Sequence, residues 1–243
     1  MHTHCSAERP VTTTIVALPS HEPQCTLARN ARLTETFQSL SKLTPGDDHL
    51  ALSPIEFFKV PISEHVELDG WCLYPPQFDP SKVNSYPLIF YVYGEPAACT
   101  VRDRWVGKVG IWHRLLAQRG AVVISVDNRG TPSLRGAAWR KYIYKSIGRN
   151  PSEDQSRALS SILRARPYIN SERVAIWGWS GGGSMSLNML FRYPDQYKTA
   201  VSVAPVPDMR LYDTIYQERY MGKSVSVKLP SLSFCNCCDI PLA

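Results

Sequence analysis

The segment Gly178-Trp179-Ser180-Gly181-Gly182 has the residue types and spacing of a nucleophilic serine on a tight turn. It matches the pattern G-x-S-x-G, in which the serine lies between a strand and a helix with its hydroxyl exposed. Glycines two positions before and after the serine let neighbouring backbone approach closely. The N–H of Gly181, at the start of the helix, would stabilise the oxyanion of an acyl-transfer reaction. The pattern therefore predicts Ser180 as a catalytic nucleophile.

The alternative interpretation of this segment is a glycine-rich turn with an incidental serine. An apolar stretch at 174–177 precedes it and a helical pattern begins near Gly183, so both neighbours that the nucleophile requires are predicted. Tyr93 ends another apolar stretch, 87–93, where sites of this type draw their second oxyanion donor. Its hydroxyl could donate to the oxyanion, or its ring could close the core at a strand end. Position alone leaves both open.

Four apolar stretches predict the strands that would position these residues. Polar and apolar residues do not alternate in them, as they would in a strand buried on one face only. The stretches lie at 87–93, 121–126, 173–178 and 199–204. Such stretches are typical of parallel strands covered by helices, and helical patterns lie at 109–119, 153–166 and 184–192. Strands and helices in this order indicate the α/β class. Earlier in the chain, the residues predict a strand at 10–18, a helix at 29–43, and a strand pair at 55–60 and 66–74.

Four blocks between about 53 and 222 resemble the dipeptidyl peptidase IV branch of the prolyl oligopeptidase family. The stretch 176–185 resembles the nucleophile segment of that branch. The segment 127–130 resembles its D-x-R-G segment, 204–206 its A-P-V segment, and 212–222 its Y-x-x-x-Y-x-E-R-Y-M-G block. The resemblance implies an α/β-hydrolase fold with a parallel core sheet, preceded by a remnant of a β-propeller.

The resemblance also implies a role for each matching residue. Ser180 would be the acylating nucleophile, and the Tyr93 hydroxyl and the Gly181 N–H would donate to the oxyanion. Tyr212 and Tyr216 would line the pocket for a proline or alanine side chain, so that peptides are cleaved after Xaa-Pro or Xaa-Ala. The branch usually has tyrosine at position 181, and with glycine we expect a thinner pocket wall. No metal and no cofactor are expected, and the resemblance makes a homodimer possible for the full-length parent.

The base that a nucleophilic serine requires is not evident in this sequence. Only 63 residues follow Ser180, and none is histidine. In α/β-hydrolases the acid and the histidine follow the serine along the chain. We therefore expect that this chain lacks the triad Asp and His and is inactive alone. A non-catalytic fragment or interaction module remains an alternative, as does an acyl-peptide hydrolase or esterase.

The resemblance divides the chain into three expected parts. Residues 1–50 would be the last propeller strands and linker, 51–222 an incomplete peptidase domain, and 223–243 an unrelated tail. The sheet would then lack its C-terminal strands. This arrangement predicts that the chain is an internal piece of a longer peptidase.

Composition excludes several other classes of protein. The net charge of +6 is mild and the basic residues are scattered, which argues against nucleic-acid binding. No stretch of about 18 apolar residues occurs, so no membrane span is predicted. Seven cysteines, three of them within 235–238, fit neither a disulfide framework nor a paired zinc site. The first residues do not form a signal peptide, and the compartment stays open.

Overall fold

The computed structural model describes residues 1–40 and 54–222. The predicted tail at 223–243 lies outside the described residues, as does the end of the predicted N-terminal part, 41–50. The chain forms two compact units, which are described separately. One comprises Met1–Glu56, Cys72–Pro80 and Arg102–Val123, and the other comprises Phe57–Trp71, Ser81–Val101 and the chain from Ile124 onward. These units do not test the predicted domain boundaries, which stay a prediction.

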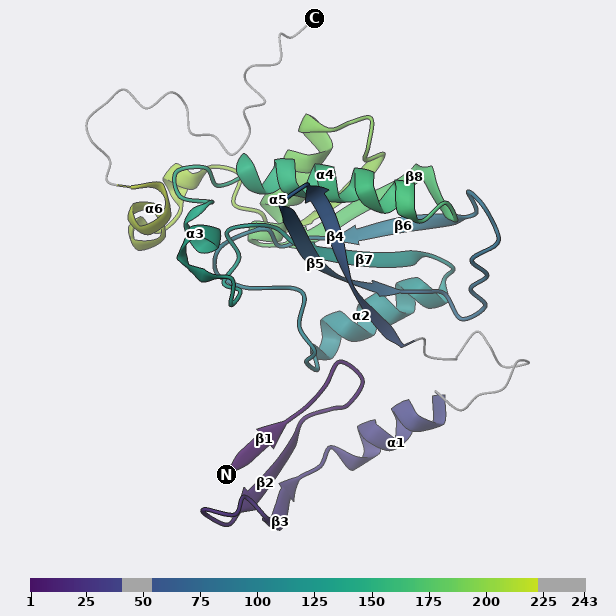
Figure 1. Ribbon diagram of the computed structural model, residues 1–243, viewed down its shortest axis with the longest axis vertical. Coiled ribbons are helices and arrows are strands. Elements are labelled where there is room, and N and C mark those ends of the chain that lie inside the picture. Colours follow the sequence, from purple (N-terminus) through teal and green to yellow (C-terminus); the bar gives the residue numbers. More distant parts are fainter. Residues whose placement is uncertain (41–53, 223–243) are drawn as a thin grey trace, which may run out of the picture. The chain divides into compact units, whose positions relative to one another are not determined.

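A six-stranded sheet forms the frame that leads to Tyr93, after β6, and to Ser180, after β8 (Figure 1). Its order is β4-β5-β7-β6-β8-β9, so the chain crosses over between β6 and β7 and returns for β8. The strands are β4 (Ile55–Ser63), β5 (Val66–Leu73), β6 (Tyr86–Tyr91), β7 (Val122–Asp127), β8 (Ile169–Trp179) and β9 (Thr199–Val203).

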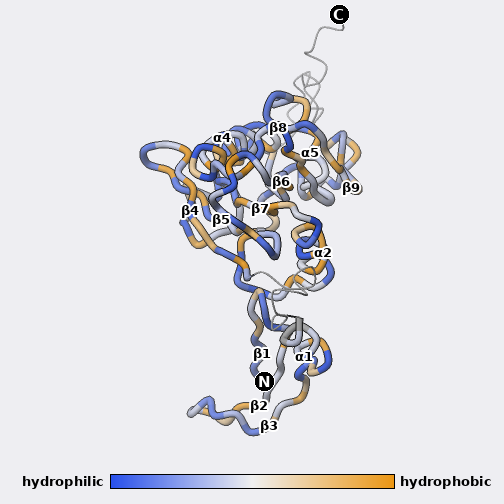
Figure 2. The backbone as a smooth tube through the Cα atoms, turned by 90° about the vertical axis from the view of Figure 1, so that its right-hand side faces the viewer, coloured by the Kyte–Doolittle hydropathy of each residue, from blue (hydrophilic) through white to orange (hydrophobic). Residues whose placement is uncertain are grey.

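The predicted parallel core of this sheet is confirmed. Strand β6 pairs in parallel with β8, with Phe90 opposite Ile176, and β8 pairs in parallel with β9, with Gly178 opposite Ser202. Every residue of β7 is buried, as its mostly apolar sequence predicts, and Figure 2 shows hydrophobic colours along part of this strand. Only two residues connect β4 to β5, and a connection this short requires an antiparallel pair. The sheet is therefore mixed, with a parallel core.

Two amphipathic helices support the candidate site. Helix α4 (Asn150–Ala165) has proline in its first turn and buries Leu159 and Ile162 completely. Burial of each of these side chains stabilises the fold by about 1.5–3 kcal/mol. Helix α5 (Gly181–Arg192) packs on β8, β9 and α4. Both helices were predicted, although α5 begins two or three residues earlier than its apolar periodicity indicated.

Two short helices were not predicted. Helix α3 (Gly136–Lys141) and helix α6 (Thr214–Met221) have no buried residues, so neither shows an apolar stripe. Helix α6 begins because the Asp213 side chain accepts a hydrogen bond from the backbone N–H of Tyr216, at 2.7 Å. Local capping, rather than an apolar face, starts this helix.

The N-terminal unit contains a separate antiparallel sheet in the order β1-β2-β3. Its predicted strand and helix are confirmed by β2 and α1, whereas β1 and β3 were expected only as extended chain. The unit is held together at Ala7, whose N–H donates to Asp103 at 2.7 Å and whose carbonyl accepts from Arg114 at 3.5 Å. Its elements are β1 (His2–His4), β2 (Thr12–Val16), β3 (Pro23–Ala28), α1 (Ala31–Leu40) and α2 (Gly107–Gln118).

No described helix has both the length and the apolar character needed to cross a membrane. The longest helix given above, α4, has 16 residues.

Candidate active site

Ser180 lies between the last residue of β8 and the first residue of α5. Its backbone has φ 56° and ψ −119°, a conformation that non-glycine residues rarely adopt. The Ser180 N–H donates to the carbonyl of Val203 on β9, at 2.9 Å. Conformations of this kind cost about 1–3 kcal/mol and persist where surrounding structure imposes them. The serine is therefore held in the strained strand-to-helix turn that its sequence pattern predicts.

The glycines around Ser180 are required by close contacts between backbones. A Cβ atom at Gly178 would lie 2.4 Å from the carbonyl oxygen of Gly182, and one at Gly182 would lie 2.2 Å from that of Val92. Such contacts are far below van der Waals distance, and backbone atoms cannot move away as a flexible side chain can. The spacing of the motif thus allows β6, β8 and α5 to meet at the serine.

Tyr93 and Gly181 provide groups suited to an oxyanion. Tyr93 follows β6 and is half-buried, and its burial, together with the nearby Glu95 carboxyl group, raises the pKa of its phenol to about 12. The phenol is therefore protonated at neutral pH and can donate a hydrogen bond. The Gly181 N–H begins α5 and has no acceptor within the helix.

The loop that carries Tyr93 is held by a buried amide network. Gly94 has φ 79°, and its carbonyl accepts from the Asn128 amide at 3.3 Å. The Asn128 side-chain oxygen accepts from Gln155 of α4, at 2.9 Å. A Cβ at Gly94 would lie 2.7 Å from the Met185 side chain. Glycine is required here both by the positive φ and by the close packing on α5.

The segment 127–130 joins three parts of the unit. Asp127 accepts from the backbone N–H groups of Thr100 at 2.8 Å and Val101 at 3.0 Å. Arg129 forms an ion pair with Asp154 of α4, at 2.7 Å. Together with Asn128, these residues fix two loops and one helix around Ser180. The segment therefore has a structural explanation in its own contacts.

Glu95 was not predicted as a functional residue. Only 7% of it is exposed, and the Tyr216 hydroxyl donates to its carboxylate at 2.8 Å. Among the described residues, no basic side chain pairs with it. Burial raises the pKa of Glu95, and the Tyr216 hydrogen bond opposes this shift only in part. One feature of the sequence could have identified Glu95 as a neighbour of the site. It lies two residues after Tyr93, in the same loop.

Glu95 changes the expectation about Gly181. A Cβ at Gly181 would lie 2.1 Å from the Glu95 carboxyl carbon and 2.4 Å from either oxygen. The carboxyl group thus occupies the space that a side chain at position 181 would enter. The thin pocket wall stays a prediction, and the Glu95 carboxyl group is the neighbour that bears on it.

Tyr212 and Tyr216, predicted to line the pocket, are brought together with two further tyrosines. The ring of Tyr216 is edge-on to that of Tyr212, with centroids 5.3 Å apart, and to that of Tyr220, at 4.8 Å. Tyr93 also belongs to this group. Tyr212 and Tyr220 lie near enough to contribute, through their electrostatic interaction, to raising its pKa. We call Tyr93, Tyr212, Tyr216 and Tyr220 the tyrosine cluster.

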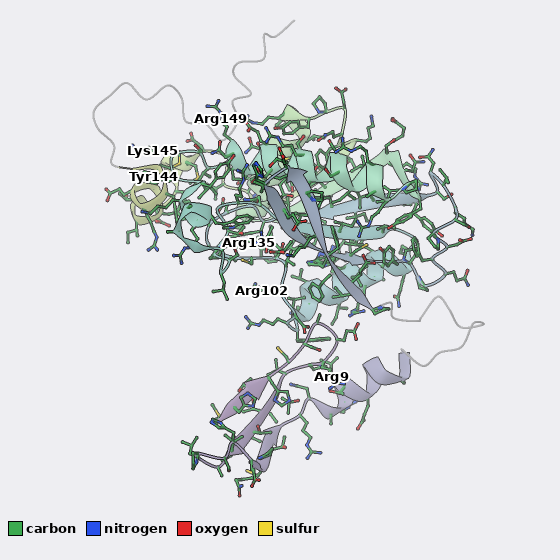
Figure 3. The ribbon with its side chains drawn as sticks, in the orientation of Figure 1. Arg9, Arg102, Arg135, Tyr144, Lys145 and Arg149 are labelled. Carbon is green, nitrogen blue, oxygen red and sulfur yellow. The ribbon has the colours of Figure 1, made fainter. Side chains whose placement is uncertain are left out.

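Helix α6 is held in place from the connection between α3 and α4. The Lys145 N–H donates to the carbonyl of Tyr220 at 2.8 Å. Tyr144 and Lys145 lie beside this helix in Figure 3, and a Cβ at Gly222 would be 3.1 Å from the side chains of both. A backbone hydrogen bond and close packing therefore position the tyrosines that α6 contributes.

A cavity of about 720 Å³ lies next to the tyrosine cluster. Pro96 and Tyr220 form part of its wall, and its basic side chains are exposed. These basic residues are Arg140, Lys141 and Arg219.

No base for Ser180 is brought to the site among the described residues. The Ser180 hydroxyl has no hydrogen-bond partner within residues 1–40 and 54–222. His113 lies on α2 in the other unit, where burial lowers its pKa to about 3. The predicted lack of a triad Asp and His stays a prediction.

Comparison with known proteins identifies relatives over most of the described chain. The model of the prolyl oligopeptidase family matches residues 112–231. A protein of Paracoccidioides lutzii described as a probable dipeptidyl-aminopeptidase B is 38% identical over 66% of this chain and 18% of its own length. A protein of the same description from Uncinocarpus reesii is 33% identical over 84% of this chain and 22% of its own. The chain thus spans about a fifth of these curated relatives.

A solved structure has the same fold. The crystal structure of Porphyromonas gingivalis dipeptidyl peptidase 4 is 35% identical, with a TM-score of 0.79, over 91% of this chain and 29% of that protein. Identity at this level, together with the shared fold, supports comparison of individual motifs as well as of the overall architecture.

Proposed function

Because the chain belongs to the prolyl oligopeptidase family and is dipeptidyl peptidase IV-like, we propose that it carries the acylation site of a serine peptidase. The observation that carries this proposal is the strained turn at Ser180 with the Gly181 N–H beside it. A protonated Tyr93 on the neighbouring loop adds a second donor.

The chemistry follows from these groups. The Ser180 hydroxyl oxygen attacks the carbonyl carbon of the scissile peptide bond, and its proton passes to a base. The resulting oxyanion accepts hydrogen bonds from the Gly181 N–H and the Tyr93 hydroxyl. The C–N bond then breaks, the amine leaves with a proton, and water hydrolyses the Ser180 ester. Loss of one oxyanion donor costs about 10²–10³-fold in rate.

The substrate in this proposal is a peptide cleaved after Xaa-Pro or Xaa-Ala. Tyr212 and Tyr216 would form the walls that contact the side chain of the second residue. A chain without an imidazole base retains only residual catalysis, because removal of a triad member leaves about 10³–10⁴-fold acceleration over water. The expected inactivity of the chain alone therefore means hydrolysis at this residual rate and not at the rate of a complete triad.

The test is release of the aryl amine from a Gly-Pro aryl amide by the full chain. We expect release that disappears in Ser180→Ala and falls about a hundredfold in Tyr93→Phe. Val83→Ala, at an exposed apolar side chain remote in sequence from the site, serves as the control. Hydrolysis that persists unchanged in Ser180→Ala would contradict the proposal.

A second candidate is an interaction module that pairs through β9. This strand is at the edge of the described sheet, and Val201 on it is 58% exposed. Exposed apolar edge strands pair readily with another chain. This candidate predicts that the chain self-associates as its concentration rises and that Val201→Lys abolishes the association. It also predicts no hydrolysis that depends on Ser180. Analytical ultracentrifugation of both forms distinguishes the two candidates.

A further inference from the structure

The cavity of about 720 Å³ beside the tyrosine cluster combines apolar walls with positive charge. Pro96, Pro132 and Ile143 provide apolar surface, and Tyr144 and Tyr220 provide aromatic rings. Ligand sites typically have a volume of about 300–1,000 Å³, with walls of this kind and a few polar groups that orient the ligand. The charged side chains of this cavity are all basic.

The three cations of the cavity come from two different helices. Arg140 and Lys141 are in the last turn of α3, and Arg219 is in the last turn of α6. The backbone hydrogen bond from the Lys145 N–H to the carbonyl of Tyr220, at 2.8 Å, connects the two sides. The cations therefore converge through the tertiary structure and not through one run of basic sequence.

None of these three cations forms an ion pair within the part of the chain that the structure describes. No described aspartate or glutamate lines the cavity, and Glu218, the acidic neighbour on α6, is exposed and lies outside it. The Arg219 guanidinium lies 5.5 Å from the ring centroid of Tyr220, which orients the group and leaves its charge in place. Uncompensated positive charge in a cavity attracts anions.

The cavity is within reach of a peptide that Ser180 attacks. Pro96, on the cavity wall, is bonded to Glu95, whose carboxyl carbon would lie 2.1 Å from a Cβ at Gly181. With standard covalent dimensions, the Cα atoms of Gly181 and Pro96 are therefore at most about 11 Å apart. Each extended residue spans about 3.3–3.6 Å, so a residue one or two positions from the scissile bond can place a charged group in the cavity.

We propose that this cavity is a carboxylate-binding subsite, in which Arg140, Lys141 and Arg219 bind a carboxylate of the peptide substrate. The carboxylate is an acidic side chain or the C-terminal carboxylate, and it belongs to a residue other than the one that supplies the scissile carbonyl. That residue keeps the proline or alanine side chain of the proposed function. Guanidinium groups suit this ligand because they donate two parallel hydrogen bonds to a carboxylate. The inference rests on the proposed function, because acylation of Ser180 is what brings a peptide to the cavity.

Four peptides separate the sources of the carboxylate. Asp-Pro-Ala-Asn-amide carries it before the scissile bond, Asn-Pro-Ala-Asp-amide carries it after that bond, Asn-Pro-Ala-Asn carries it at a free C-terminus, and Asn-Pro-Ala-Asn-amide carries none. Binding to the full chain with Ser180→Ala, which prevents cleavage, is measured by isothermal titration calorimetry at neutral pH and low salt. We expect at least one charged peptide to bind about tenfold more tightly than the uncharged peptide, a factor typical of a hydrogen bond to a charged group. The preference should shrink at about 1 M salt, which screens exposed charges.

Arg140→Gln and Arg219→Gln each remove one cation, from opposite sides of the cavity. Each should reduce the preference about threefold, and the double variant should abolish it. Arg149→Gln is the matched control, because Arg149 is an exposed arginine on the connection between α3 and α4 that does not line the cavity (Figure 3). This control should keep the preference. If circular dichroism shows that Arg219→Gln is misfolded, Arg219→Lys keeps the charge and should keep most of the preference.

Equal affinity for all four peptides would overturn the proposal, as would a preference that survives in the double variant or that high salt leaves unchanged. An equal loss in Arg149→Gln would overturn it too, because the effect would then come from net charge and not from the cavity. So would failure of every peptide to bind at tens of millimolar. Carboxylate binding in Ser180→Ala without any hydrolysis by the wild type contradicts the peptidase proposal alone. Ser180-dependent hydrolysis without a carboxylate preference contradicts this inference alone.

Discussion

Asp154 and Glu95 are both buried carboxyl groups of the same unit, yet they are stabilised in opposite ways. Asp154, on α4, accepts three hydrogen bonds from Arg129: one from its backbone N–H at 3.1 Å, and two from its guanidinium at 3.0 and 2.7 Å. Glu95, on the loop after β6, accepts from the phenol of Tyr216. The first carboxylate has a charged partner, the Arg129 guanidinium, and the second has a neutral one.

The comparison shows that Asp154 stabilises the fold through its ion pair, whereas burial of Glu95 is not compensated by a charged partner. The Arg129–Asp154 pair joins a loop to α4, and the Arg129 guanidinium also lies 3.6 Å from the ring centroid of Tyr142. Paired and hydrogen-bonded charges of this kind organise structure. Buried groups without a charged partner have shifted pKa values and are concentrated at functional sites. Glu95 therefore differs from Asp154 both in its position beside Gly181 and in the charge of its hydrogen-bond partner.

The largest expected effect comes from breaking the complete pair. Asp154→Ala leaves Arg129 partly buried without its counter-charge, and we expect a loss of about 3 kcal/mol in the free energy of unfolding. Urea unfolding followed by circular dichroism measures it. Glu153→Gln, the neighbouring acidic residue on the same helix, should lie within about 0.5 kcal/mol of the wild type. If Asp154→Ala lowers the free energy of unfolding by less than about 1 kcal/mol, the Arg129–Asp154 pair does not stabilise the fold as proposed.

The next effect concerns the space that Glu95 fills. Gly181→Ala places a Cβ against the Glu95 carboxyl group, and we expect a loss of about 2 kcal/mol from overpacking. In the Glu95→Ala background the same substitution should cost much less. The coupling energy in this double-mutant cycle should reach about 1 kcal/mol. Additive effects would mean that the carboxyl group does not occupy this space in solution.

Glu95 should give the stability of the chain a measurable dependence on pH. Burial raises the pKa of Glu95 above its ordinary value of 4.5, so its contribution to stability is present below that value and is lost as pH rises through the folded-state pKa. The stability of the wild type relative to Glu95→Gln should therefore decline as pH increases above 4.5. Unfolding by urea at a series of pH values measures this difference. A constant difference would contradict the shift.

The smallest expected effect is at the nucleophile. Ser180→Gly removes the strain of a positive φ, and we expect about 1 kcal/mol of stabilisation, partly offset by the greater freedom of glycine in the unfolded chain. Thermal unfolding measures it, with Ser184→Gly in the interior of α5 as a control that should destabilise. A destabilised Ser180→Gly would show that the turn is not strained.

Much of the frame could be predicted from local pattern. The apolar stretches of β6, β7 and β9 are continuous and short, as in strands that are covered on both faces, and the apolar residues of α4 repeat at the helical period. Helix α6 could not be found in this way, because it has no buried residues and depends on its Asp213 cap and on the Lys145–Tyr220 hydrogen bond. Periodicity reports burial on one face, and α6 has no such face.

The sequence by itself determined the turn at Ser180, because its glycines and its flanking strand and helix are all local. Only the tertiary structure decided what stands beside that turn. Parallel pairing of β6 with β8 brings the loop after Tyr91 against the first residues of α5, and Glu95 thereby enters the space of a side chain at Gly181, 86 positions later in the chain. Proximity between residues so far apart depends on the strand order, which no local pattern contains.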